Sequence, residues 1–211
     1  MSDFTLTPSS TLIVGMTGSG KTIFSIRYLL NAPDVACRFI YDDLYRIAPR
    51  LKLRPCYTAR EVEASLETRW SVCDPRRMFA DARDPLRTSF AWWSDWVYHA
   101  SRRGPGKKLV LVDELWRFCT EDSIPRGLQL IANAGREENI ELVCCTQQPE
   151  LINASITGQC TELVCFRLQS PESLRAIAKL GADAEHVARL PLGTFLSYDR
   201  LTGASLAGRL F

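Results

Sequence analysis

The sequence has 211 residues, of which 46% are hydrophobic and 24% charged, and its 26 Lys and Arg residues against 24 Asp and Glu residues give a formal net charge of +2. These values are typical of one globular domain, and the chain is too short for two enzymatic domains with a linker. The near-neutral balance argues against a protein that holds nucleic acid through bulk positive charge, so any polyanion must be contacted locally or by several subunits together. We therefore expect a single domain over residues 1–211.

The cysteines and the amino-terminal residues favour a reducing cytoplasm as the cellular compartment. Eight cysteines occur, at positions 37, 56, 73, 119, 144, 145, 160 and 165, and none has C-x-x-C or Cys/His zinc spacing. Several lie inside apolar runs, which favours reduced core thiols. Residues 1–5 lack the basic and apolar regions of a signal peptide, and no run approaches the roughly 18 apolar residues of a membrane span. We expect a protein without a membrane span, made and kept in a reducing cytoplasm.

Short apolar runs alternate with longer amphipathic stretches, which predicts an α/β fold with a mostly parallel central sheet flanked by helices. Residues 109–112 are the clearest strand, because they are continuously apolar, as expected for a strand buried on both faces. In chain order, the predicted strands cover residues 11–14, 37–41, 70–73, 109–112, 140–145, 163–168, 194–198 and 205–210. The last two, joined through Thr202 and Gly203, are predicted to form an antiparallel hairpin at a sheet edge.

Helices are predicted between these strands. The first covers residues 21–31, a capping-box pattern with Thr58 and Glu61 marks a second, and two shorter helices follow at residues 171–180 and 183–190. The stretch after Pro85 has apolar residues at helical spacing, namely Leu86, Phe90, Trp93, Val97 and Ala100. We interpret this stripe as one packed helix face. Trp92 and Trp96 lie off the stripe, and we interpret them as packing residues.

A phosphate-binding motif follows the first predicted strand. The segment is Gly15-Met16-Thr17-Gly18-Ser19-Gly20-Lys21-Thr22 and matches G-x-x-x-x-G-K-[ST], the P-loop or Walker A motif. Glycines let backbone N–H groups surround a β-phosphate, and the helix N-terminus adds a favourable dipole. In this motif Lys21 neutralises the β- and γ-phosphates, and Thr22 places its hydroxyl on Mg²⁺.

An acidic pair at the end of a buried strand supplies the second element, the Walker B pattern. Asp113 follows residues 109–112 directly and is predicted to hold Mg²⁺ through water, and Glu114 is placed to polarise the attacking water. The alternative is a simple helix N-cap. The pair favours an ATPase over small-molecule kinases, whose nucleophile is a substrate hydroxyl, and over GTPases, whose N-K-x-D signature is absent.

Two further polar residues flank the strand at residues 140–145. Gln147 follows it and could sense the γ-phosphate or orient water, if this strand neighbours the strand before the P-loop. Arg136 precedes it on a predicted loop, where an arginine supplied across a subunit boundary could stabilise charge in the transferring phosphoryl group. A turn glutamine without a role and a solvated surface arginine are the alternatives.

The order of these segments resembles that of the HerA and FtsK superfamily of P-loop DNA-pumping ATPases, within the additional-strand class. The resemblance rests on residues 15–22, 109–114, 135–136 and 146–149. It extends to residues 190–195, which are similar to the family's Leu-Pro-x-Gly-x-Phe edge. The small size, with no appended barrel, transmembrane or winged-helix module, is most similar to the genome-packaging ATPases of tailless icosahedral viruses with an internal membrane.

The resemblance implies a role for each matching residue: phosphate binding for Lys21, Mg²⁺ ligation for Thr22 and Asp113, water activation for Glu114, γ-phosphate sensing for Gln147, and a finger acting in trans for Arg136. It also implies ATP and Mg²⁺, and a ring oligomer, commonly a hexamer, that moves double-stranded DNA without sequence preference. Capsid vertex or portal proteins would be partners, in the host cytoplasm or on the virion. The chain departs from the family at Gln148, where Arg or Ser often precedes the proline.

Other functions and contacts stay open. A Zot-like assembly ATPase of filamentous phage is one alternative, although that family usually carries a transmembrane segment. A nucleotide-switched, partner-binding ATPase is another, although partitioning ATPases have a lysine where Met16 and Thr17 stand. Residues 102–108 and the pair Arg76 and Arg77 are candidate DNA contacts, but such runs are more often a solvated charged surface.

Overall fold

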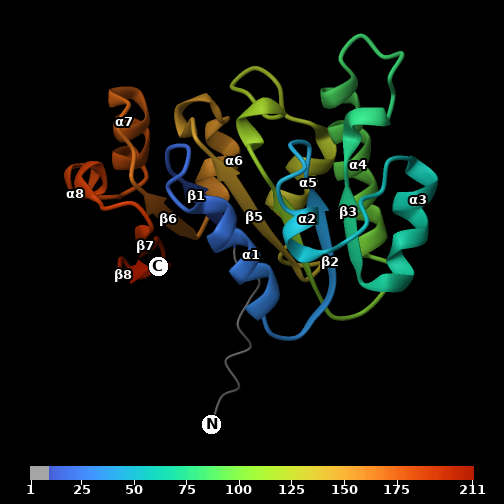
Figure 1. Ribbon diagram of the computed structural model, residues 1–211, viewed down its shortest axis with the longest axis horizontal. Coiled ribbons are helices and arrows are strands. Elements are labelled where there is room, and N and C mark those ends of the chain that lie inside the picture. Colours follow the sequence, from blue (N-terminus) through green and yellow to red (C-terminus); the bar gives the residue numbers. More distant parts are fainter. Residues whose placement is uncertain (1–9) are drawn as a thin grey trace.

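The computed structural model describes residues 10–211, which form one sheet of eight strands with helices on both faces (Figure 1). The strands are β1 (Ser10–Val14), β2 (Val35–Tyr41), β3 (Trp70–Cys73), β4 (Lys107–Val112), β5 (Ile140–Thr146), β6 (Glu162–Phe166), β7 (Thr194–Asp199) and β8 (Ser205–Arg209). Their order in the sheet is β3-β2-β4-β5-β1-β6-β7-β8. The first six in this order are parallel, whereas β7 and β8 pair antiparallel at one edge. The predicted fold class is confirmed.

The position of β5 determines how the functional segments meet. β5 lies between β1 and β4, with Leu12 of β1 opposite Cys144 and Val110 of β4 opposite Leu142. This inserted strand is the feature that the additional-strand class predicts. Because the three strands are parallel, the loops that follow them open at the same edge of the sheet.

Alternating strand residues build a core on each face of the sheet. The helices are α1 (Lys21–Asn31), α2 (Ala48–Leu51), α3 (Ala59–Ala64), α4 (Pro85–Ser101), α5 (Arg126–Ala134), α6 (Ala154–Gln159), α7 (Pro171–Lys179) and α8 (Ala184–Arg189). On β4, Leu109 and Leu111 pack in a cluster with α1 and α2, whereas Val110 and Val112 pack in a cluster with α4 and α5. In Figure 1, α1 and α2 lie in front of the sheet. Strands covered on both faces are continuously apolar, which is why the sequence pattern found them.

The tryptophans of α4 are packing residues, as predicted. Trp93 is fully buried, and Trp96 is buried with its ring edge-on to Phe39 at 5.7 Å between centroids. Trp92 is half-buried and stacks on Trp96 at 6.2 Å. The aromatic face of α4 is therefore wider than the single stripe that the spacing predicted.

The cysteines are free thiols, seven of them buried and Cys37 half-buried. Burial raises the pKa of Cys160 to about 12 and that of Cys37 to about 11, so both stay neutral at physiological pH. The expectation of unpaired core thiols is confirmed. Within residues 10–211, no helix combines the length and the apolar character needed to cross a membrane. The expectation for residues 1–5 lies outside the described residues.

Three helices and several strand ends differ from the prediction. The helices α2, α5 and α6 were not predicted, and β2 begins at Val35 rather than at residue 37. α2 has only four residues and α6 only six, too few to show a helical period. α5 begins after Pro125 without a side-chain cap, so its start carries no capping signal. The N-cap of α6, Asn153, accepts from Ser155 N–H at 2.9 Å and was a usable signal.

Gly127 allows α5 to approach α4 closely, and its replacement should destabilise the fold. A Cβ on Gly127 would lie 2.0 Å from the backbone nitrogen of Asp95 and 2.2 Å from the carbonyl carbon of Ser94. We expect Gly127→Ala to lower the free energy of unfolding by about 3 kcal/mol, because the helices must move apart. The control is Gly158→Ala in α6, where a Cβ meets no atom within 4 Å and should add up to about 1 kcal/mol of stability. Urea unfolding followed by circular dichroism measures both, and equal midpoints for the two variants would contradict the prediction.

Candidate active site

The P-loop, residues 15–22, joins the carboxyl end of β1 to the first turn of α1. Its entry is held by the neighbouring strand, because Gly15 N–H donates to the carbonyl of Thr146 at 3.3 Å. Gly18 and Gly20 have φ angles of 75° and 117°, a left-handed conformation that other residues rarely adopt. The loop therefore curls in front of α1, whose first N–H groups have no partner within the helix and favour an anion.

The side chain of Lys21, the first residue of α1, folds back over the start of this loop. Its Nζ donates to the carbonyl oxygens of Gly15 at 2.7 Å and Met16 at 3.1 Å. Burial lowers the pKa of Lys21, and the nearby Glu114 opposes that shift. Thr22 follows in the first helical turn and is half-buried. A cavity of about 340 Å³ opens here, and it is lined by Thr17, Gly18, Ser19, Gly20, Lys21, Thr22, Ile23, Arg46, Arg50, Gln147 and Phe211.

The acidic pair lies at the end of β4 and is almost fully buried. Asp113 and Glu114 are each 2% exposed. Asp113 Oδ2 has no hydrogen-bond partner among residues 10–211, and burial together with the neighbouring Glu114 raises the pKa of Asp113 to about 6. Glu114 has φ 51°, a left-handed conformation that costs energy outside glycine and is often kept at functional sites. The N-cap alternative does not hold for the short turn that follows, because Glu114 makes no side-chain cap hydrogen bond there.

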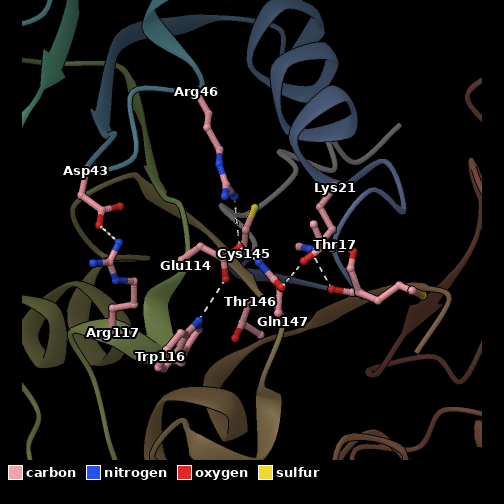
Figure 2. A network of polar contacts seen from close by, with 12 residues as sticks. Thr17, Lys21, Asp43, Arg46, Glu114, Trp116, Arg117, Cys145, Thr146 and Gln147 are labelled. Atoms are coloured by element: carbon pink, nitrogen blue, oxygen red, sulfur yellow. Dashed lines mark hydrogen bonds and ion pairs between the residues drawn. The ribbon is translucent and has the colours of Figure 1, made fainter. Parts of the chain in front are cut away.

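Gln147 connects the P-loop to the acidic pair. Thr17 Oγ1 donates to Gln147 Oε1 at 2.6 Å, and Gln147 Nε2 donates to Glu114 Oε1. Glu114 Oε2 also accepts from Trp116 Nε1 at 3.1 Å, and Arg46 Nη1 lies 3.5 Å from Glu114 Oε1. Figure 2 shows these side chains converging on Glu114 from different segments of the chain. Glu114, Gln147 and the P-loop thus form one connected network.

Comparisons with known proteins bear on the fold. Neither the protein-family models nor the curated proteins gave a match to the sequence. Among solved structures, the genome packaging NTPase B204 from Sulfolobus turreted icosahedral virus 2, in complex with ATP-gammaS, is similar with a TM-score of 0.73 and 21% identity, over 96% of this chain and 98% of that one. The chain shares its fold with this packaging NTPase. The EccC ATPases 2 and 3 of Thermomonospora curvata reach a TM-score of 0.60 at 14% identity over 97% of this chain and 37% of that one. The N-terminal domain of zonular occludens toxin from Neisseria meningitidis reaches 0.50 at 16% identity over 97% and 95%.

The residues predicted to hold Mg²⁺ suit that ion. The carboxylate oxygen of Asp113 that lacks a partner is a hard oxygen ligand, and Thr22 supplies a hydroxyl at the start of α1. Residues 10–211 contain no cluster of three or more His, Cys, Asp or Glu side chains that could hold a metal by themselves. Mg²⁺ commonly takes one or two protein ligands and completes its shell with phosphate and water, so a site of this kind needs a nucleotide to be complete.

Arg136 does not join the P-loop of its own chain. It is exposed and lies between α5 and β5, at the amino-terminal edge of the sheet, whereas the P-loop lies at the carboxyl-terminal edge. The seven residues of β5 separate the two edges by roughly 23 Å at about 3.3 Å per residue. Arg136 lines a separate surface pocket with Gly158 and Arg200. Any contact between Arg136 and a nucleotide therefore requires a second subunit.

Several residues of the site carry no sequence signal. Arg46 and Arg50 reach the cavity from the segment after β2, three strands away from β1 in the sheet. Trp116 follows the acidic pair by two residues but belongs to no motif. Gly193, by contrast, lies in a segment that the sequence did mark, the Leu-Pro-x-Gly-x-Phe edge. Its N–H donates to the carbonyl of Ser19 in the P-loop at 3.1 Å. The glycine of the Leu-Pro-x-Gly-x-Phe edge thus supports the phosphate loop.

The two groups of candidate DNA contacts differ in the partners of their charged side chains. In residues 102–108, Arg102 pairs with Glu138 at 2.9 Å, Arg103 with Glu63 at 3.0 Å and Lys107 with Glu141 at 2.5 Å. These pairs favour a charged surface that is neutralised within the chain. Arg76 and Arg77 are exposed after β3, where Arg76 pairs with the buried Asp74 and Arg77 lies over the ring of Tyr57 at 4.9 Å.

Proposed function

We propose that this chain is an ATP-hydrolysing DNA translocase that packages double-stranded viral DNA into a capsid as a ring oligomer, with residues 1–211 as one ATPase domain. The observation that carries the proposal is that Gln147 lines one cavity with the P-loop and also hydrogen-bonds to Glu114 of the acidic pair. The likeness of fold to a viral genome packaging NTPase over nearly the whole length of both chains supports the packaging role.

We propose a task for each residue of the site. Lys21 and the P-loop N–H groups bind the β- and γ-phosphates, and Thr22 and Asp113 hold Mg²⁺, which neutralises charge on the phosphates when bound. Glu114 takes a proton from a water molecule that adds to the γ-phosphorus. The bond from the γ-phosphorus to the bridging oxygen breaks, and its electron pair leaves with ADP. Gln147 orients Glu114 and reports on the P-loop through Thr17.

The partners follow from this function. A motor must tolerate any sequence, so it would grip DNA through phosphate contacts rather than by reading bases. We propose a hexameric ring in which Arg136 of one subunit acts on the nucleotide of the next, because Arg136 lies at the sheet edge opposite its own P-loop. Capsid vertex or portal proteins would receive the ring, in the host cytoplasm or on the virion.

A Zot-like phage assembly ATPase is the second candidate, and one observation favours it. The zonular occludens toxin domain shares the fold over 97% of this chain, although with a lower TM-score than B204. Such a factor would act on single-stranded DNA complexes at a membrane. Stimulation of turnover by single-stranded DNA alone would select this candidate over packaging of double-stranded DNA.

ATP turnover as a function of protein concentration tests the ring motor. We expect turnover per subunit to rise with concentration and with double-stranded DNA, and to fall at least 100-fold in Arg136→Ala, because an arginine finger contributes about 10³–10⁵-fold. Arg60→Ala, an exposed arginine on α3, is the control and should keep the wild-type rate. Turnover that ignores both concentration and DNA would instead support a nucleotide switch. An unchanged rate in Arg136→Ala would remove Arg136 from catalysis.

A further inference from the structure

An arginine outside the predicted motifs faces the phosphate cavity. Arg46 follows β2 and lines the cavity together with P-loop residues. Its Nη1 lies 3.5 Å from Glu114 Oε1, and 40% of its side-chain surface is exposed. In Figure 2, Arg46 points from the top of the view toward Glu114 and Cys145. Neither the sequence motifs nor the roles assigned above use this residue.

The backbone of Arg46 is held rigidly by a buried carboxylate. Asp42 has no exposed surface, and its two oxygens accept from the N–H groups of Arg46 at 2.7 Å, Ile47 at 2.9 Å and Ala48 at 2.8 Å. Ile47 and Ala48 are buried in the core on the α1 face of the sheet. Arg46 therefore starts from a fixed turn, so the fold determines where its guanidinium can reach.

The charges around the cavity favour a bound anion. Lys21 and Arg46 line the same cavity, and each loses energy from the other's charge, since Arg46 adds to the effect of burial in lowering the pKa of Lys21. The buried carboxylates of Glu114 and Asp113 offset the charge of Lys21, because both act against the lowering of its pKa. A phosphate between two cations would be stabilised by both, and the planar guanidinium matches two phosphate oxygens at once.

We propose that Arg46 binds the γ-phosphate of the nucleotide held by its own subunit, and that this contact withdraws Arg46 from Glu114 and leaves that carboxylate free to act on water. This inference rests on the proposed ATPase function. Arg46 lines the cavity with the P-loop while its Nη1 lies beside Glu114, so a phosphate bound in the cavity would compete with Glu114 for the guanidinium. The ion pair with Arg46 occupies the carboxylate oxygen that would otherwise face water, so hydrolysis would depend on the presence of the third phosphate.

Arg50 holds the backbone of Arg46 in place. Its Nη1 donates to the carbonyl of Arg46 at 2.6 Å, and its side chain lines the outer part of the same cavity. Arg50 makes no contact with the acidic pair. Arg46 is therefore the residue whose charge changes partner when phosphate binds.

Equilibrium binding of ATPγS and ADP to wild type, Arg46→Ala and Arg46→Lys tests the contact. We expect Arg46→Ala to weaken ATPγS binding at least tenfold and ADP binding less than threefold, because only ATPγS carries a third phosphate group. Arg46→Lys should recover part of the ATPγS affinity. Arg54→Ala is the control, since that side chain is 87% exposed and pairs only with Glu61, and it should bind both nucleotides as wild type does. Equal losses for both nucleotides, or no loss, would overturn the proposal.

A second comparison tests the exchange of partners. Glu114→Gln removes the charge that holds Arg46, so this variant should bind ATPγS more tightly than wild type, and the gain should disappear in the double variant with Arg46→Ala. A gain that persists in the double variant would overturn the exchange. In steady state, Arg46→Ala should lower kcat about 100-fold, beyond its effect on KM. A wild type that binds both nucleotides but does not hydrolyse ATP would end the proposed function, while the ATPγS-to-ADP ratio would still decide the contact of Arg46.

Discussion

Replacement of Glu114 with glutamine is expected to abolish ATP hydrolysis while ATP binding is retained. Glutamine has the same shape and keeps one oxygen that accepts from Trp116 Nε1, so the packing around the site should survive, although its NH2 group then loses the hydrogen bond from Gln147 Nε2. It cannot accept a proton from water, and loss of a general base lowers the rate by about 10²–10⁴-fold. Multiple-turnover kinetics with ATP, together with ATPγS binding, measure both properties.

The control for this variant is Glu121→Gln, which changes an exposed glutamate in the loop beyond the acidic pair. It should hydrolyse ATP at the wild-type rate. If Glu114→Gln also kept the wild-type rate, Glu114 would not be the base, and its left-handed backbone and buried hydrogen bonds would have to be explained as structural. Loss of ATPγS binding in Glu114→Gln would show that the carboxylate holds the site together rather than acting on water.

Replacement of Asp113 with asparagine should stabilise the fold and inactivate the enzyme. The carboxylate is 2% exposed, and its pKa rises from 3.8 to about 6 because burial and Glu114 disfavour its charge. At about 1.36 kcal/mol per pKa unit, the charged form costs roughly 3 kcal/mol at neutral pH. Asparagine removes that cost, but it also removes the negative ligand proposed for Mg²⁺, so Mg²⁺-dependent hydrolysis should fall by at least 100-fold.

The pH dependence of this gain follows from the direction of the shift. A carboxyl group with a raised pKa binds its proton more tightly in the folded state than in the unfolded state. The contribution of this bound proton to the stability of the fold is therefore complete below about pH 4 and is lost as the pH rises through about 6. The stability difference between Asp113→Asn and wild type should therefore be absent at pH 4 and full at pH 7.5. Thermal unfolding of both proteins across this range measures it.

A second buried aspartate offers a matched comparison. Asp42 is also fully buried, but its carboxylate accepts three backbone N–H groups, and asparagine has only one acceptor oxygen to replace two. Asp42→Asn should destabilise the fold by about 1.5–3 kcal/mol at pH 7.5. Stabilisation by Asp113→Asn and destabilisation by Asp42→Asn would separate an aspartate placed for a ligand from one placed for the fold. A loss of stability in both variants would contradict this reading of Asp113.

Local sequence was sufficient for most of the sheet and for the phosphate loop. Strands such as β4 are covered on both faces, so burial requires an unbroken apolar run, and this run is visible without a structure. The P-loop is similarly local, because its conformation depends on glycines and a helix start within eight residues. The helices that escaped prediction, such as α6, are short and owe their conformation to neighbours rather than to a helical period.

By itself, the sequence determined the α/β class, the phosphate loop and the acidic pair after β4, since each of these depends on residues that are adjacent in the chain. Only the tertiary structure decided that Gln147 joins Thr17 to Glu114, that Arg136 lies at the opposite edge of the sheet, and that Arg46 faces the cavity. These relations depend on the order of the strands, with β5 placed between β1 and β4. Strand order results from long-range packing, in which segments more than a hundred residues apart in the sequence become neighbours. The local patterns of one sequence do not encode which distant segments pair.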